Sequence, residues 1–328
     1  MKTVWKINRS ILLTMIVAAV AIGFTASAAW AQGVPPVVWS RTALQYDNGQ
    51  APSVAISGLV IVEVHEGNPG ELWYRTGRIQ ESGSVVWTKT SVKYGSGYAP
   101  SIAISGNDII EVHQAGTGVG VLFYRGGSIS AAGQVTWAPT SVQYDTGLAP
   151  SVALAGQTIV EVHQAGTGVG ALWYRTAEIL NNGNVVWNSK AFQYEIGAAP
   201  SVAIAGSNVI EVHQGQLGAG SLWYHAAAIQ ANGSVIWAPN GFQYDNGLAP
   251  SISTSGPVAI EIHQGGSGVG ALYSQTVAME ASGDVQFLGA AQYDVGEAPR
   301  LAVVGPTILE VHQSTTGVGL LYYHTAAY

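Results

Sequence analysis

Hydrophobic and polar residues alternate with a period of two, in short runs, along almost the whole chain after residue 38. Each run is bounded by Gly, Asn, Pro or Ser, which is typical of β-strands separated by turns. Between Ser101 and Val142 four such runs follow one another: SIAIS, DIIEVHQ, VLFYR and QVTWAPTSV. The pattern therefore predicts an all-β chain made of four-stranded antiparallel units.

The unit is about fifty residues long and occurs six times. Each copy opens at a tyrosine, and its second strand carries a Glu two positions before a His. The opening residues are Tyr46, Tyr94, Tyr144, Tyr194, Tyr244 and Tyr293. Tandem units of this size are typical of solenoids and β-propellers.

The two ends of the chain distinguish a ring from a linear array. The last unit stops at LLYYHTAAY, after its third strand, and the segment from Val37 to Leu44, VVWSRTAL, matches the missing fourth strand. A linear array is expected to have atypical caps, whereas a ring gains from pairing its two ends in one sheet. The sequence predicts a six-bladed β-propeller with four antiparallel strands per blade, closed by an N-terminal strand that completes the last blade. The small-residue first strand is expected innermost and the aromatic-rich third and fourth strands outside.

One face of the ring is expected to carry the segments YDxGxAPS and QxGTGVG as loops, and the other face only short hairpins such as SGND. In YDxGxAPS, we expect Asp47, Asp145, Asp245 and Asp294 to cap their own backbone and the Gly to adopt a positive φ. Ligand contact and a calcium site are the alternatives for this segment. GTGVG lacks the Lys and the following helix of a phosphate-binding P-loop.

The N-terminus has a different composition. Lys2, Lys6 and Arg9 precede an apolar run from Ile11 to Phe24, and small residues follow up to Ala31. This arrangement is typical of a cleaved secretory signal peptide, with an uncleaved anchor as the alternative. We therefore expect residues 1–31 to be a signal peptide and residues 32–328 to form a single propeller domain. The mature protein is expected to be secreted, periplasmic or extracellular, with no membrane span.

Charge and cysteine content narrow the possible partners. The formal net charge is −7, only 9% of residues are charged, and there are no cysteines. An acidic chain without basic patches is not expected to bind nucleic acid or anionic lipid surfaces. Without disulfides, the fold must depend on its core and on ring closure. A neutral polar surface suits neutral polar ligands, and no cofactor or metal is expected.

The repeated Glu and His point to the same side of their strand because they are two positions apart. They could form a metal half-site or an acid–base couple in each unit. A buried, hydrogen-bonded network is the preferred interpretation, since an unpaired carboxylate in mid-blade would be costly. WD-repeat propellers resemble this chain in burying a polar set in each blade, although the WD dipeptide is absent. The residues of this structural polar network are Glu63, His65, Glu111, His113, Glu161, His163, Glu211, His213, Glu261, His263, Glu310 and His312.

Candidate ligand-binding residues are the polar and aromatic side chains near the decorated face. They include the residue after most of the EVH motifs, two loop aspartates, and aromatic and basic residues of the third strand. The set is Gln114, Gln164, Gln214, Gln264, Gln313, Asp145, Asp245, Trp73, Trp173, Trp223, Arg75, Arg125 and Arg175. Most of the aromatic residues are expected to pack between blades. The Arg is replaced by His225, Gln275 and His324 in the last three units.

The repeat resembles those of secreted lectin propellers, including the bacterial and fungal fucose-binding type, over the chain from Val37 to Tyr328. The resemblance implies sugar pockets between blades, in which a Glu and an Arg hydrogen-bond the sugar and an aromatic ring packs on it. Glu111, Arg125 and Trp137 are the same ingredients in this chain. The EVHQ and LWYR repeats are also similar to accessory repeats of bacterial secreted proteins.

Three functions follow as hypotheses. Repetition favours a secreted, multivalent, non-enzymatic carbohydrate-binding propeller whose partners are glycans, because several weak sites gain from avidity whereas catalysis needs one asymmetric constellation. A structural or protein-interaction scaffold with a protein partner is the alternative. A propeller hydrolase or lyase ranks third, since no Ser-His-Asp order, HExxH motif or isolated acid pair is present.

Overall fold

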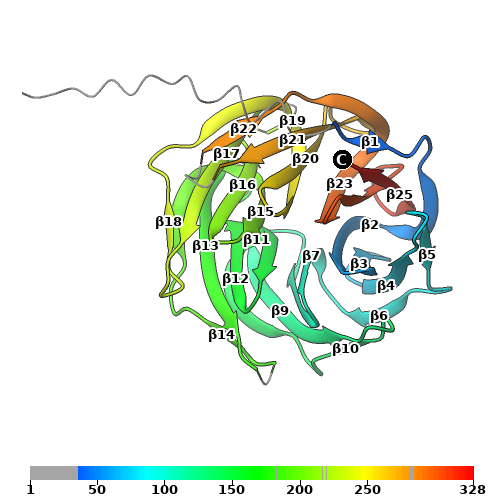
Figure 1. Ribbon diagram of the computed structural model, residues 1–328. Helices are drawn as coiled ribbons and strands as arrows, with labels where there is room; N and C mark the ends of the chain where they lie inside the picture. Colours follow the sequence, from blue (N-terminus) through cyan, green and yellow to red (C-terminus); the bar gives the residue numbers. More distant parts are fainter. Residues whose placement is uncertain (1–35, 182, 216, 219, 281–283) are drawn as a thin grey trace, which may run out of the picture.

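The computed structural model describes residues 36–328 except 182, 216, 219 and 281–283. The expected signal peptide, residues 1–31, lies outside the described residues. Every regular element within the described ranges is a β-strand, and the strands pair antiparallel, which confirms the all-β prediction. None of these residues belongs to a helix with the length and apolar character needed to cross a membrane. Figure 1 shows the strands grouped around a central axis in a propeller-like arrangement.

The strands are of four kinds. The long ones are β2 (Leu44–Ser57), β11 (Val142–Ala155), β15 (Phe192–Ala205), β19 (Phe242–Ser255) and β23 (Ala291–Val304), and the same stretch is divided into β6 (Val92–Gly95) and β7 (Tyr98–Ser105) in one copy. The EVH strands are β3 (Val60–Glu66), β8 (Asp108–Gln114), β12 (Thr158–Gln164), β16 (Asn208–Gln214), β20 (Val258–Gln264) and β24 (Thr307–Gln313). The aromatic strands are β4 (Leu72–Ile79), β9 (Gly120–Ile129), β13 (Gly170–Ile179), β17 (Gly220–Ile229), β21 (Gly270–Met279) and β25 (Gly319–Ala327). The short outer strands are β1 (Val38–Trp39), β5 (Val85–Trp87), β10 (Val135–Trp137), β14 (Val185–Trp187), β18 (Val235–Trp237) and β22 (Val285–Phe287).

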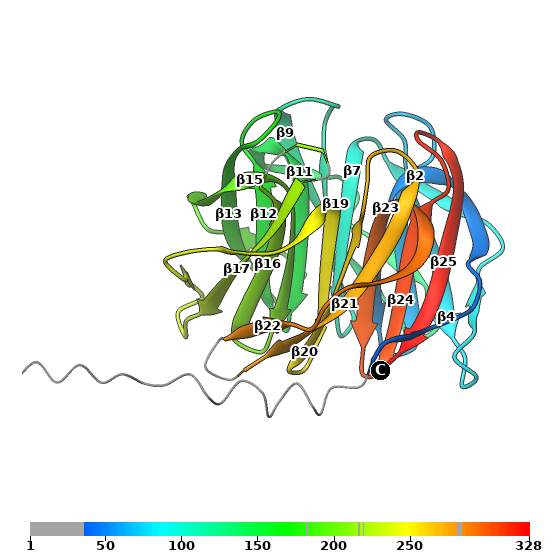
Figure 2. The same cartoon turned by 90° about the horizontal axis from the view of Figure 1, so that it is seen from above.

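The long strands join consecutive units. The first half of β11 pairs with β9 of the preceding unit, and its second half pairs with β12 of its own unit. The second halves line the axis, because a narrow central cavity is lined in turn by β2, β7, β11, β15, β19 and β23. The predicted innermost position of the small-residue strand is therefore confirmed. Figure 2 shows the strands running between two faces of the molecule.

The prediction that YDxGxAPS is a loop is wrong. The segment lies within the long strands, where a register shift lets one strand leave a sheet and enter the next. The expected positive φ also falls on another residue, since Ala149 has φ 49° and Gly147 does not lie in the left-handed region. Gly147 is required by space instead: a Cβ there would lie 2.5 Å from Cδ2 of His163 and 2.6 Å from the carbonyl oxygen of Gln164.

The single fourth strand predicted for each unit is divided into two pieces in the structure. In the third unit, β14 pairs with the end of β13, and the first half of β15 pairs with the beginning of β13. The stretch between the two pieces, from Asn188 to Ala191, is largely exposed and belongs to no strand, although the backbone N–H of Asn188 donates to the carbonyl of Thr176 at 2.9 Å. The outer edge of each unit is therefore shared between a short strand and the start of the next long one.

The two ends of the described chain lie side by side (Figure 1). β1 pairs with β25, with Val38 opposite Ala327, and β2 pairs with β25, with Leu44 opposite Tyr323. This is the pairing that the sequence predicts for the N-terminal segment and the last unit. Trp39 also stacks on Tyr293, with ring centroids 4.2 Å apart. The equivalent pair of an internal unit, Trp187 and Tyr144, stacks in the same way at 4.4 Å.

Hydrophobic cores lie between successive units. One core combines Val112 of β8 with Ile159 of β12, and another combines Leu309 of β24 with Ile61 of β3, so the last unit packs on the first. The EVH strands supply most of these contacts because both of their faces are covered and nearly every residue is buried. Apolar burial between units is the main source of stability for such a cysteine-free chain.

Candidate active site

The Glu and His of the EVH strands form one buried pair per unit. In each unit the His Nδ1 lies 2.9–3.2 Å from a carboxylate oxygen of the Glu. The Glu side chains are fully buried and the His side chains are 2% exposed. In three units the opening Tyr donates its hydroxyl to the same carboxylate, from Tyr46 to Glu63, Tyr144 to Glu161 and Tyr244 to Glu261. The paired arrangement agrees with the preferred sequence interpretation, and within the described ranges no group of three or more His, Asp or Glu is arranged to hold a metal ion.

The glutamines expected to bind a ligand occupy a different position. Gln114, Gln164, Gln214, Gln264 and Gln313 are all buried. The Gln114 side-chain oxygen accepts a hydrogen bond from the backbone N–H of Ala149, and its nitrogen donates to the carbonyl of Gly116. Ala149 is the residue with positive φ in the next long strand, so the amide holds a strained turn of the neighbouring unit in place. The structure therefore places these glutamines in the scaffold between units and not in a ligand pocket.

Two of the predicted basic residues of the third strand, Arg75 and Arg175, are paired with carboxylates of the long strands. Arg75 Nη1 lies 3.3 Å from Asp47 Oδ2, and Arg175 Nη1 lies 3.2 Å from Asp145 Oδ2. The replacements keep the contact: His225 lies 3.3 Å from Glu195, Gln275 donates to Asp245 at 3.4 Å, and His324 lies 2.6 Å from Asp294. Arg125 faces Gly95, the one copy without a carboxylate, and donates to backbone carbonyls of Tyr94, Ala138 and Pro139.

The predicted aromatic residues Trp73, Trp173 and Trp223 are half-buried. At the equivalent positions in other units, Phe123, Tyr273 and Tyr322 stack on the buried His, with ring centroids 5.5–5.9 Å apart. Trp223 donates its indole N–H to Ser221 Oγ at 2.9 Å. The indole nitrogens of Trp73 and Trp173 are buried without a partner in the described part of the chain. Of the three, Trp73 lies in the wall of a pocket.

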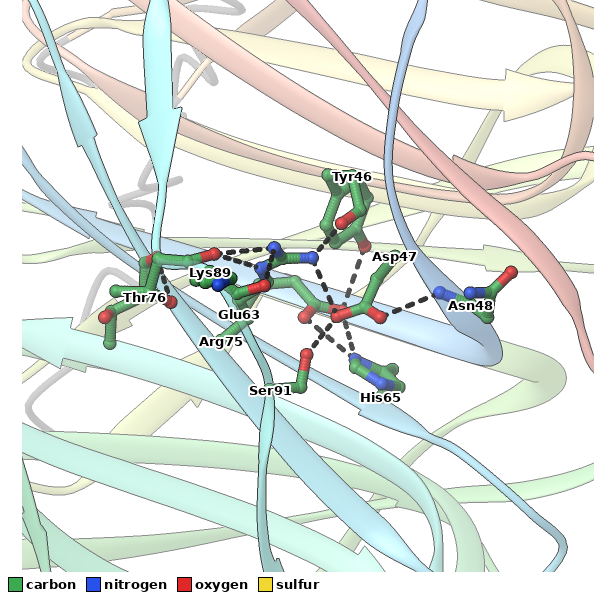
Figure 3. A network of polar contacts seen from close by, with 10 residues as sticks. Tyr46, Asp47, Asn48, Glu63, His65, Arg75, Thr76, Lys89 and Ser91 are labelled. Atoms are coloured by element: carbon green, nitrogen blue, oxygen red, sulfur yellow. Dashed lines mark hydrogen bonds and ion pairs between the residues drawn. The ribbon is translucent and has the colours of Figure 1, made fainter.

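That pocket opens in the first unit, between the start of β2 and the loop that joins β3 to β4. It has a volume of about 440 Å³. Its chemistry comes from Asp47, His65, Trp73, Arg75 and Lys89, with Asn48, Gly67, Asn68, Thr90, Ser91 and Val318 completing the wall. The residues converge from four segments, and Figure 3 shows Asp47 at the centre of their polar contacts.

Asp47 is held by several donors (Figure 3). Its Oδ1 accepts the backbone N–H of Asn48 at 2.9 Å, and its Oδ2 accepts the hydroxyl of Ser91 and pairs with Arg75. Arg75 is fixed in turn, since Nη1 donates to the carbonyl of Tyr46 and Nε donates to the carbonyl of Thr88 at 2.9 Å. The Asp47 side chain remains 16% exposed. The site therefore presents one oriented, partly exposed carboxylate to the pocket.

His65 lies behind this carboxylate and is linked to the buried pair. Its Nδ1 is 2.9 Å from Glu63 Oε2, and Glu63 also accepts the hydroxyl of Tyr46. Burial lowers the pKa of His65, but the carboxylates of Glu63 and Asp47 raise it by more, so the net pKa lies above the ordinary value. In the sixth unit the matching His312 Nε2 lies 3.7 Å from Asp294. The imidazoles of His263 and His312 are thus each placed between a buried Glu and a partly exposed Asp.

The first unit differs from the others around this pocket. Its loop from β3 to β4 is EGNPGEL in place of QAGTGVG and its variants. Glu71 in the loop pairs with Lys93 at 2.7 Å and accepts a hydrogen bond from Asn68 at 3.0 Å. Asp47 was expected from the sequence to cap its own backbone, and the hydrogen bond from the Asn48 N–H agrees with that expectation, but Lys89 and Ser91 were not among the candidate residues. The departure of this copy from the repeat was the available signal.

Comparison with known proteins gives a fold and no family. No protein-family model matches the chain, and no curated protein matches it. A Bacteroides uniformis protein assigned as a 6-phosphogluconolactonase is similar in structure, with a TM-score of 0.54, 13% identity, and 79% of this chain and 76% of that one covered. The Trypanosoma rangeli sialidase has a TM-score of 0.56 and 10% identity, and a mutant of it with trans-sialidase activity has 0.57 and 9%. The alignments cover 89% of this chain but only 60% and 59% of the two sialidase chains.

These comparisons correct the functional expectation. The chain was expected to be a non-enzymatic, lectin-like carbohydrate-binding propeller, whereas the solved structures that it resembles are described as enzymes. A lectin family is not supported. At 9–13% identity the likeness establishes a propeller-like fold, and any reaction has to be argued from the residues of this chain.

Proposed function

We propose that the protein is a hydrolase of a small, hydroxylated ester or lactone, and that the pocket around Asp47 is its active site. The observation that carries this proposal is the oriented, partly exposed carboxylate of Asp47 in a pocket of about 440 Å³. A volume of this size suits a sugar-sized molecule. The proposal includes a six-bladed propeller as the scaffold, supported by six copies of the unit and by the pairing of β1 with β25.

The number of carboxylates favours an ester or lactone over a glycosidic bond. Hydrolysis of a glycosidic bond usually needs two carboxyl groups on either side of the bond. Asp47 is the only carboxylate among the residues that line this pocket. Water attack on a carbonyl carbon needs one base and donors for the developing oxyanion, and both are available here.

The roles follow from the contacts. Asp47 accepts a proton from water as the water oxygen bonds to the carbonyl carbon, and it returns that proton to the leaving alkoxide as the C–O bond breaks. Arg75 and Ser91 fix the orientation of Asp47, whose side chain lies in the pocket wall and remains 16% exposed. The exposed Lys89 lies in the pocket wall and provides a cation for the oxyanion, while Trp73 offers an apolar ring surface to the substrate.

A matched pair of variants tests the proposal. The protein is offered a panel of hydroxylated lactones and short esters, and acid release is followed in a pH-stat. Asp47→Asn is expected to lower the rate by about 10²–10⁴, the usual contribution of a general base. Asp145→Asn removes the same type of Arg-paired carboxylate from a unit with the long loop and is expected to retain activity. Absence of hydrolysis across the panel, or an equal loss in both variants, would contradict the proposal.

We also propose that the mature protein begins near Gln32 and is exported. The basic, apolar and small-residue segments of residues 1–31 support this. N-terminal sequencing of the protein recovered outside the cytoplasm is expected to start at or beside Gln32. A start at Met1 in the exported fraction would contradict cleavage.

A further inference from the structure

A cavity separate from the pocket around Asp47 lies on the axis of the molecule, at the end where the inner strands begin. Its volume is about 150 Å³, and its wall is made of the Ala-Pro-Ser segments of successive units. The serines are Ser53, Ser101, Ser151, Ser201 and Ser251. In the last unit the position of the serine is taken by Arg300. One cation is therefore placed in a ring of hydroxyl groups.

The hydroxyl oxygens of the ring already accept hydrogen bonds from the backbone. Ser53 Oγ accepts the N–H of Ile102, Ser101 Oγ that of Val152, and Ser151 Oγ that of Val202, each at 3.2 Å. A hydroxyl that accepts in this way still has its own hydrogen to donate. None of these three hydroxyls donates a hydrogen bond to another group in the described part of the chain. Their hydrogens are available to an acceptor inside the cavity.

Arg300 is the only charged residue among those that line the cavity. Its guanidinium donates from Nη1 to the carbonyl of Pro299 at 2.9 Å. No carboxylate of the described residues lies within 4.0 Å of it, whereas Arg75 and Arg175 each have an Asp partner. Burial lowers the pKa of Arg300 to about 10, so the group stays protonated at neutral pH. Its positive charge is therefore not neutralised within the described protein.

A charge in this position calls for a counter-ion. Arg300 is half-buried. A partly desolvated cation without a partner is costly, and a charge-assisted bond to a carboxylate or phosphate is one of the strongest that Arg makes. The volume corresponds to only a few water molecules, each of which occupies about 30 Å³ in the liquid, and this limits the ligand to a few non-hydrogen atoms. We infer that the axial cavity is a binding site for a small oxyanion, held by the guanidinium of Arg300 and the hydroxyls of the serine ring. This site is independent of the pocket around Asp47.

The repeat itself supplies the variant that tests this inference. Arg300→Ser restores the residue found at the same position in the other five units, so the fold is expected to be kept. Arg78→Ser removes the same charge from an exposed side chain that donates to the carbonyl of Ala131 at 3.0 Å, and it serves as the matched control. Binding of sodium acetate and of inorganic phosphate is measured by isothermal titration calorimetry at constant ionic strength.

The unmodified protein and Arg78→Ser are expected to bind at least one of the two anions with a stoichiometry of one, and Arg300→Ser to lose at least tenfold in affinity. Binding of acetate alone would identify the ligand as a carboxylate, and binding of phosphate alone as a phosphate-type anion. Two outcomes overturn the inference: no saturable binding of either anion by the unmodified protein, or equal affinity in Arg300→Ser. Neither outcome bears on hydrolysis, because Arg300 does not line the pocket around Asp47.

Discussion

The glycine that precedes each positive-φ alanine permits a sharp test of what holds adjacent units together. In Gly147→Ala the new Cβ would lie 2.5 Å from Cδ2 of His163 and 2.6 Å from the carbonyl oxygen of Gln164. Ordinary carbon contacts are about 3.5–4.0 Å, so one of these groups has to move by about 1 Å. The carbonyl belongs to β12, and the imidazole is held by Glu161 at 3.1–3.2 Å, so neither can move freely.

The magnitude follows from these two constraints. Overpacking of a buried site costs about 1–3 kcal/mol, and disturbing the buried hydrogen bond of His163 adds about 1–3 kcal/mol. The expected loss of unfolding free energy is therefore about 2–6 kcal/mol. Because 1 kcal/mol corresponds to about 2–4 °C for a chain of 150–250 residues, Tm should fall by about 4–24 °C.

Gly156→Ala is the matched control for this substitution. Gly156 has φ 57°, but no atom lies within 4 Å of the position of its Cβ. Only backbone strain is expected, and it costs about 1–2 kcal/mol for a left-handed residue. Thermal unfolding followed by circular dichroism, with urea titrations of the same proteins, measures both losses. If Gly156→Ala is the more damaging change, or if Gly147→Ala shifts Tm by less than about 2 °C, the close approach to His163 does not constrain the fold as described.

Two other properties of the structure give predictions about stability. Burial lowers and the neighbouring carboxylates raise the pKa of the buried histidines, and the net pKa is above the ordinary value for His65, His163, His213, His263 and His312. A raised folded-state pKa contributes stability that is complete below about pH 6.5 and is lost as the pH rises through the folded-state value. Tm measured by scanning calorimetry should therefore decline from pH 6 to pH 9. A Tm that increases over this range would mean that the histidine pKa values are lowered by folding and not raised. Trp39→Ala removes the stack on Tyr293 and the hydrogen bond to Ser274 at 2.8 Å, and it should cost about 3 kcal/mol in urea unfolding. Val38→Ala, at a side chain that is 68% exposed, should be nearly neutral, and equal effects of the two changes would mean that pairing of the ends does not stabilise the fold.

Strand positions could be predicted from the sequence because period-two alternation and turn residues depend on local burial. The short runs around Ile110 and Val160 became buried strands, and the pairing of Val38 with the end of the chain followed from a missing fourth strand. The course of the YDxGxAPS segment could not be predicted in the same way. Its Gly and Pro suggest a turn, yet the segment is a strand that passes from one sheet to the next, and its backbone groups form hydrogen bonds in both sheets. Some of these hydrogen bonds depend on residues distant in sequence, such as Gln114, whose side chain accepts the N–H of Ala149.

The candidate site was harder to predict because the repeat directs attention to the wrong residues. Gln114 and its equivalents recur in nearly every unit and were expected to bind a ligand. Their recurrence has a structural explanation, because each of these side chains accepts a backbone N–H of the next unit. Asp47 looked like one turn residue among several. The shorter loop from Glu66 to Glu71 marks the first unit as different from the others, but its sequence does not show that it forms the wall of a pocket.

Differences between copies within one chain therefore carry more functional information than the shared residues. Units that pack on one another in the same way face the same packing and backbone requirements, so a scaffold role should keep a position the same in every copy. The carboxylate of the long strand keeps a polar partner when the Arg is replaced, as in Glu195 with His225 and Asp294 with His324, which is typical of a structural pair. Arg300 replaces a serine with no compensating acid among the described residues, and the short loop after Glu66 has no counterpart in another unit. Both changes bring only local contacts that the other units do without, from Arg300 to the carbonyl of Pro299 and from Glu71 to Lys93 and Asn68. The axial cavity and the first-unit pocket are therefore the two places where a ligand best accounts for the residues present.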